Sequence, residues 1–149
     1  MLSLLPLPAD AYPQVFEWEH GAATYEDWFA HITRPNYLNY GVFRETEMVG
    51  YLGLEKTSQA VRFHVSTRRH QVKPSETRRL VIHTGIYLFQ NGIERLETMP
   101  LLTNHPARRL AIACGMRLET VHIINHLAHA CYTLMKDSYL QNPQRWEAD

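Results

Sequence analysis

The sequence has few cysteines, no excess of either charge and no long apolar run. Its two cysteines, Cys114 and Cys131, are too few for a disulfide framework and lack the spacing of metal ligands, so we expect small core residues. Fifteen basic residues balance fifteen acidic ones, so the net charge favours neither nucleic acid nor a membrane as a partner. No apolar run approaches the roughly 18 residues of a membrane span.

The first residues also lack the features of a secretory signal. The apolar stretch that starts at Leu2 has no basic segment before it, and Pro6 and Pro8 interrupt it. We therefore expect a reducing setting, either the cytoplasm or a particle assembled in it.

What the sequence does contain is a regular alternation of short elements. Its 149 residues, of which 45% are hydrophobic, suit one domain with one core. We expect this α/β domain to span residues 1–137, followed by a polar tail at 138–149. The patterns predict strands at 2–7, 37–44, 48–55, 61–66 and 93–102, and helices at 12–20, 24–32, 74–90 and 106–114.

The segment from Leu118 to Lys136 admits two interpretations. Its β-branched residues and a break near Ala128-His129 favour a β-hairpin, whereas its leucines, alanines and methionine would also suit a helix. A helix would align His122, His126 and His129 on one face and could hold zinc. In a strand, His129 is expected to point away from the other two. We prefer the hairpin and predict no metal.

The most informative motif is Thr103–Met116, TNHPARRLAIACGM. Asn104 precedes a short helix, Ala107 and Leu110 follow at intervals of three, and Gly115-Met116 comes before a new strand. This pattern resembles the segment N-x-x-[AS]-x-x-[LF]-x-x-x-x-G-[FM] of the GNAT superfamily of N-acetyltransferases. The predicted order of elements, β-α-α-β-β-β-α-β-α-β-β, is similar to that of the same superfamily.

The resemblance implies a fold and a cofactor. The fold is a single GNAT-like domain, with a mixed, mostly antiparallel sheet of six to seven strands, about four flanking helices, and a splay between the fourth and fifth strands. The cofactor is acetyl-CoA, whose pyrophosphate lies on the amides at the start of the long helix in this superfamily. Those amides lack partners within the helix, and the helix dipole is positive there.

One landmark of the superfamily is missing. The glycine-rich loop Q/R-x-x-G-x-G/A corresponds to Arg68–Arg79, and counting back from Gly92 puts Lys73, Ser75 and Thr77 at the glycine positions. A shift of one residue puts Pro74 and Glu76 there, so neither register supplies a glycine. Five basic residues could compensate by charge: Arg68, Arg69, Lys73, Arg78 and Arg79. The resemblance implies phosphate binding by Ser75, Thr77 and Arg78, backbone pairing by His64 and Val65, and a cleft lined by Asn104.

Acetyl transfer to an amine also needs proton transfers. The resemblance places Ala111 where many of these enzymes have a general-acid tyrosine. The candidate general bases are Glu97 on the fifth strand and His64 on the fourth. Each residue could instead have no catalytic role. Glu97 would then be a carboxylate on the exposed surface of a strand, and His64 a strand histidine whose hydrogen bonds are all made within the protein.

Two functions remain open on the sequence alone. The missing glycines and tyrosine favour a non-catalytic binding or assembly protein with a degenerate acetyl-CoA site. That pattern is similar to small GNAT-like proteins of tailed-phage structural modules, which implies a protein partner or a homo-oligomer, and a virion in an infected host cell. The alternative is an acetyl-CoA-dependent N-acetyltransferase acting on an amine.

Overall fold

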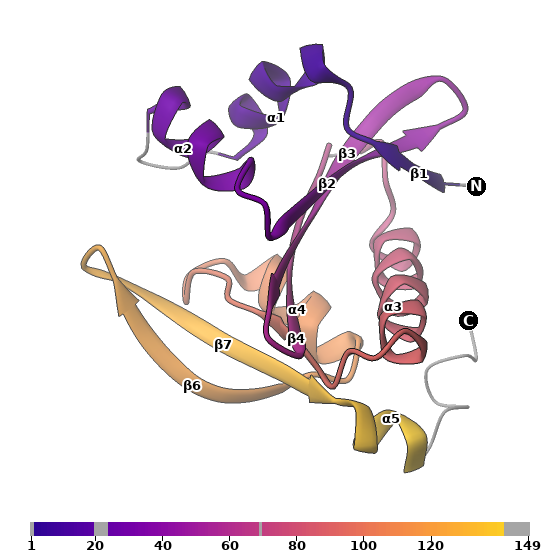
Figure 1. Cartoon of the computed structure of the whole chain (residues 1–149), viewed down its shortest axis with the longest axis vertical. Coiled ribbons are helices and arrows are strands. Elements are labelled where there is room, and N and C mark those ends of the chain that lie inside the picture. Colours follow the sequence, from indigo (N-terminus) through magenta and orange to yellow (C-terminus); the bar gives the residue numbers. More distant parts are fainter. Residues whose placement is uncertain (1, 20–23, 69, 142–149) are drawn as a thin grey trace. The chain divides into compact units, whose positions relative to one another are not determined.

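The computed structural model describes residues 2–19, 24–68 and 70–141 (Figure 1). Arg69 and the part of the predicted tail at 142–149 lie outside the described residues. The strands are β1 (Leu2–Pro6), β2 (Tyr37–Arg44), β3 (Glu47–Thr57), β4 (Ala60–Thr67), β5 (Arg95–Thr98), β6 (Arg117–Ile124) and β7 (Leu127–Met135). The helices are α1 (Tyr12–Trp18), α2 (Tyr25–Ile32), α3 (Pro74–Gln90), α4 (His105–Ala113) and α5 (Lys136–Gln141), with a 3₁₀ turn at Ala9–Ala11.

The strands form one mixed sheet in the order β1-β2-β3-β4-β5-β7-β6. β4 and β5 run parallel and pair over Ala60–Phe63 and Arg95–Thr98 only, although β4 continues to Thr67. The predicted fold class, with its splay between the fourth and fifth strands, is therefore confirmed. None of the helices in the described ranges is long and apolar enough to cross a membrane.

The chain divides into two compact units. Unit 1 comprises Met1–Lys56 and His64–Lys73, and unit 2 comprises Thr57–Phe63 and Pro74–Asp149. In unit 1, Leu7, Val15 and Tyr51 form a buried cluster, against which Trp18, Trp28 and other half-buried side chains pack. Thr24 caps the start of α2, because its hydroxyl accepts a hydrogen bond from the Asp27 amide at 3.2 Å.

A glycine of β3 is required by close packing in unit 1. A Cβ atom at Gly50 would lie 2.9 Å from the backbone oxygen of Ser66, and that oxygen cannot rotate away. We expect Gly50→Ala to lower the free energy of unfolding by about 2 kcal/mol, measured by urea denaturation.

Gly41 is the matched control on the neighbouring strand β2. A Cβ atom there would meet only side-chain atoms of Phe43 and Met48, which can turn aside. Gly41→Ala should therefore cost less than about 1 kcal/mol. Equal losses for the two variants would contradict the packing argument.

In unit 2, α3 matches its predicted range and ends at Gln90; Gly92 follows it with a φ of 94°, which suits glycine. The helix begins at Pro74, so Ser75 lies in its first turn and does not cap it. The predicted strand at 93–102 was too long. Only Arg95–Thr98 is a strand, and Pro100, which lacks an amide donor, comes two residues after its end.

The hairpin predicted for Leu118–Lys136 is confirmed, but its turn was misplaced. The turn is Asn125-His126, whose φ angles of 51° and 67° are typical of a two-residue type I′ turn. As a result, His122 and His129 lie directly opposite each other on one face of the hairpin, contrary to the prediction. The described residues contain no group of three side chains suited to a metal ion.

Candidate functional site

In unit 1, one imidazole is held by a carboxylate. The Nε2 atom of His64, on β4, lies 2.6 Å from the Oε2 atom of Glu19, and the Ser66 hydroxyl donates to the same oxygen at 3.0 Å. The Glu19 side chain is 11% exposed and that of His64 is 59% exposed. Because a carboxylate only accepts hydrogen bonds, Nε2 carries the proton and Nδ1 is the basic nitrogen of the neutral ring.

The same contact sets the protonation of His64. Desolvation opposes its positive charge, but the hydrogen bond to Glu19 and the carboxylate's charge outweigh this, so the pKa of His64 is raised. A raised pKa means that the folded state binds the proton more tightly than the unfolded state does. The resulting stabilisation is present below the unfolded value of about 6.5 and disappears as pH rises through the higher folded value.

This linkage predicts a pH-dependent difference between the native protein and Glu19→Gln. We expect the variant to unfold at a lower temperature, with the largest deficit near pH 6 and a smaller one as pH rises through the folded pKa of His64. Thermal unfolding between about pH 6 and pH 9 measures this. Ser66→Ala, which keeps the carboxylate, should show a deficit that does not vary with pH. A constant deficit in Glu19→Gln would contradict the linkage.

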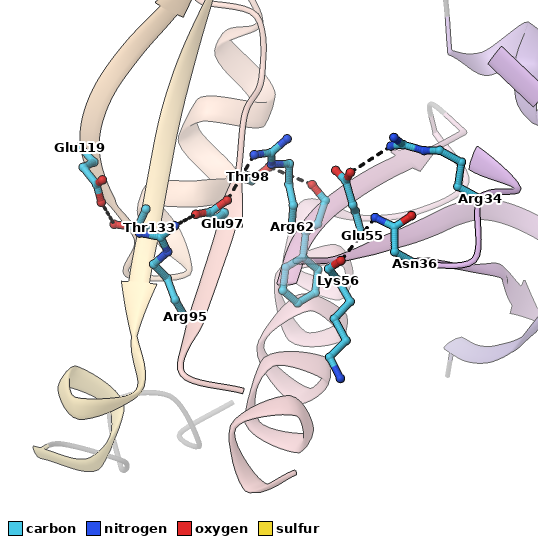
Figure 2. A network of polar contacts seen from close by, with 11 residues as sticks. Arg34, Asn36, Glu55, Lys56, Arg62, Arg95, Glu97, Thr98, Glu119 and Thr133 are labelled. Carbon is cyan, nitrogen blue, oxygen red and sulfur yellow. Dashed lines mark hydrogen bonds and ion pairs between the residues drawn. The ribbon is translucent and has the colours of Figure 1, made fainter. Parts of the chain in front are cut away.

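In unit 2, Glu97 lies between two arginines (Figure 2). Its Oε1 atom is 3.4 Å from a terminal nitrogen of Arg62 on β4, and its Oε2 atom contacts a terminal nitrogen of Arg95. The Glu97 side chain is only 7% exposed, so the alternative of a surface carboxylate was wrong. Since both oxygens face guanidinium groups, Glu97 acts first as their counter-ion. As a base it is less available than His64.

The start of α3 is where the resemblance places the pyrophosphate. Thr77 is buried, so its side chain points inward and does not occupy the space outside the first turn, whereas Ser75 is exposed. Arg78 donates from Nε to the backbone oxygen of Ala113, at the end of α4, over 3.0 Å. Arg68 lies 3.8 Å from Glu47. Both arginines therefore have partners in the structure, and the first turn of α3 also contains an acidic residue, Glu76.

The remaining predicted site residues lie in β4 and α4. His64 and Val65 directly follow Phe63, the last β4 residue that pairs with β5. Asn104 caps α4, because its side-chain oxygen accepts from the Ala107 amide at 3.2 Å. Ala111, at the position of the superfamily's tyrosine, is 3% exposed and belongs to the core.

Neither cysteine is suited to nucleophilic catalysis. Burial raises the pKa of the Cys114 thiol to about 11, even though Arg78 opposes the shift. Burial also raises the pKa of Cys131, and the charges of Glu97 and Glu119 add to the effect. Because the thiolate is the reactive form, both cysteines are structural, as the sequence predicted.

Sequence reasoning missed Glu19. It lies 45 residues from His64 along the chain, directly after α1, and no local motif marks it. The only feature in the sequence that could have pointed to Glu19 is its place at the end of a predicted helix. The fold brings its carboxylate to His64 on the fourth strand.

Comparison with known proteins supports the fold. No family model matches the sequence, and no similar sequence was found among curated proteins. Among solved structures, the aminoglycoside acetyltransferase AAC(6′)-Ib in complex with coenzyme A has a TM-score of 0.77 at 12% identity, covering 96% of this chain and 99% of that one.

Two further structures are similar over nearly their whole length. The ribosomal-protein-S18-alanine N-acetyltransferase of Escherichia coli has a TM-score of 0.73 at 16% identity, with coverage of 91% and 94%. The spermidine/spermine N-acetyltransferase SpeG of Vibrio cholerae, in complex with manganese ions, has a TM-score of 0.73 at 16% identity, with coverage of 94% and 95%. These likenesses, with the strand order and the β4–β5 splay, show that the chain has the fold of the GNAT acetyltransferases.

Proposed function

We propose that the protein is an acetyl-CoA-dependent N-acetyltransferase that transfers an acetyl group to an amine, with His64 as the general base. The observation that carries this proposal is the 2.6 Å contact between His64 and Glu19. It fixes the tautomer of an exposed histidine and raises its pKa. The acetyltransferase structures that share the fold support the same reaction class.

The proposed chemistry assigns one task to each member of the pair. Acetyl-CoA supplies the activated acetyl group, and CoA thiolate leaves when the amine nitrogen bonds to the acetyl carbon. Nδ1 of His64 takes the proton that the ammonium acceptor must lose before it can attack. Glu19 keeps Nε2–H in place and stabilises the imidazolium that forms.

The start of α3 is proposed to bind the pyrophosphate through its first-turn amides. Thr77 leaves that space open because its side chain is buried, and Ser75 can add a hydroxyl donor. The resemblance further suggests that the backbone of His64 and Val65 pairs with the pantetheine arm and that Asn104 lines the cleft. The assembly interpretation gains no support from the fold or from the comparisons.

Thermal unfolding with millimolar acetyl-CoA tests the proposal. A ligand at about 100 times its dissociation constant adds roughly 2.7 kcal/mol to the folded state. For a chain of this length, we expect the melting temperature to rise by roughly 5–10 °C. CoA should give a comparable rise and ADP a smaller one. An unchanged melting temperature with acetyl-CoA would overturn the proposal and leave only the fold in common with the enzymes.

A pair of α3 variants locates the binding. Ser75→Glu places a negative charge at the first turn and should weaken acetyl-CoA binding about tenfold or more. Tyr87→Glu adds the same charge at an exposed position, 63% accessible, near the other end of the helix, and should leave binding unchanged. Equal effects of the two variants would place the cofactor elsewhere.

A further inference from the structure

The edge strand β6 carries no buried side chain. All eight of its residues are exposed, on both faces, and the exposed fractions of Val121, Ile123 and Ile124 are 46%, 69% and 42%. β6 lies at the end of the strand order, with β7 as its only neighbour among the described strands. Exposed edge strands usually carry lysine or proline, which prevent pairing with another chain. The stretch from Thr120 to Ile124 has neither, and it has no charged residue.

The hairpin turn determines which backbone groups point outward from β6. The residues that flank a two-residue type I′ turn form a hydrogen-bonded pair, here Ile124 and Leu127. Because hydrogen-bonded and non-hydrogen-bonded pairs alternate along an antiparallel ladder, His122 and His129 form the next hydrogen-bonded pair. Val121 and Ile123 therefore direct their N–H and C=O groups to the open edge.

A bulge limits the stretch that can accept another strand. The register of β6 against β7 shifts between Leu118 and Thr120. The regular part of the edge is therefore Thr120–Ile124, with His122 at its centre.

We propose that β6 pairs with β6 of a second copy of this chain, antiparallel, about a twofold axis that passes beside His122. Val121 of each copy then lies opposite Ile123 of the other, and all the outward N–H and C=O groups of these residues become paired. Thr120 lies opposite Ile124 of the other copy. Val121 and Ile123 from the two copies form an aliphatic cluster on one face of a sheet that continues through both chains.

A second copy suits this edge better than a charged partner does. The stretch is its own complement about His122, since every opposed pair on either side of the central His122 pair combines two β-branched residues. Because basic and acidic residues balance, with a formal net charge of +0, two copies do not repel each other. The absence of charge on Thr120–Ile124 offers nothing to an acidic or a basic peptide.

Cysteine cross-linking tests the register. With the axis at His122, the two His122 residues form a non-hydrogen-bonded pair with Cα atoms about 4.5 Å apart, which suits a disulfide. Under mild oxidation, His122→Cys should cross-link to itself. Thr120→Cys should not, because its two copies lie four residues, or about 13 Å, apart along the strands. A mixture of Thr120→Cys and Ile124→Cys chains should give the mixed dimer. Because the native Cys131 lies opposite Thr120 across the same hairpin and could bond to a cysteine there, all three variants are made in a Cys131→Ala background; Cys114 is buried.

Sedimentation of the full chain tests the association itself. The native protein should be a dimer, and Ile123→Lys should be monomeric because an inserted charge blocks the edge. The control is Ile112→Lys, which adds the same charge to α4 at a residue that is 60% exposed, and it should stay dimeric. A monomeric native protein at about 100 µM, well above the dissociation constants of most specific dimers, would overturn the proposal. A dimer that survives Ile123→Lys would do the same, as would self-cross-linking of Thr120→Cys without that of His122→Cys.

Discussion

Replacing Glu97 with glutamine is expected to lower the free energy of unfolding by about 2–4 kcal/mol. The substitution removes the negative charge that lies between Arg62 and Arg95, while leaving a side chain of almost the same shape. Breaking a fully buried ion pair by removing one partner costs about 3–5 kcal/mol. The two arginines are 38% and 41% exposed, so water screens part of the repulsion that remains, and we expect a loss somewhat smaller than for a fully buried pair.

Glu119→Gln provides the control on the same face of the sheet. Glu119 accepts a hydrogen bond from the Thr133 hydroxyl at 3.0 Å, and a glutamine oxygen can accept the same bond. Its effect should stay within about 0.5 kcal/mol. Urea denaturation of both variants measures these changes in the free energy of unfolding. A Glu97→Gln protein as stable as the native one would show that the arginines do not need this counter-ion.

The role of Glu97 shows where prediction from sequence stops. The sequence placed Glu97 correctly on the fifth strand and His64 correctly on the fourth. Its burial was not foreseen, because it depends on the pairing of β5 with both β4 and β7, which brings Arg62 and Thr133 opposite it. A carboxylate on a short polar strand gives no local sign of such partners.

Helix ends could be predicted from the sequence because they depend on residues that are close together along the chain. Thr24 and Asn104 lie at or just before the start of their predicted helices and cap them, and Gly92 follows the end of the long helix. The hairpin turn was misplaced because Asn125 and His126 both adopt the left-handed conformation without the glycine that usually marks a type I′ turn. Two positive φ angles without a glycine leave a weak signature in the sequence.

The contact between His64 and Glu19 could be found only from the tertiary fold. Each residue alone is ordinary, a strand histidine and a carboxylate after a helix, and 45 residues separate them. The order of elements along the chain could be predicted, but the side chains that meet across the sheet could not. The candidate base could therefore be named from sequence, whereas the group that holds it could not.

Replacing His64 with glutamine is expected to lower kcat for acetyl transfer by about 10²–10³-fold, the usual contribution of a general base. Glutamine can still meet Glu19 but cannot take a proton at neutral pH. The KM for acetyl-CoA should change little, because the proposed pyrophosphate contacts lie on α3. Release of CoA thiol with a set of primary amines measures the rate. A variant with native kcat would assign the proton transfer to another group.

Glu19→Gln separates a base held by a carboxylate from a histidine that only shapes the site. Glu19 raises the pKa of His64, so its loss lowers that pKa and frees the basic nitrogen at lower pH. The acid limb of kcat/KM should therefore move to lower pH, while the maximal rate falls because the base is weaker. Ser66→Ala keeps the carboxylate, so its profile should retain the native acid limb. If the limb of Glu19→Gln stays in place while the rate falls, Glu19 acts on the shape of the site and not on the proton transfer.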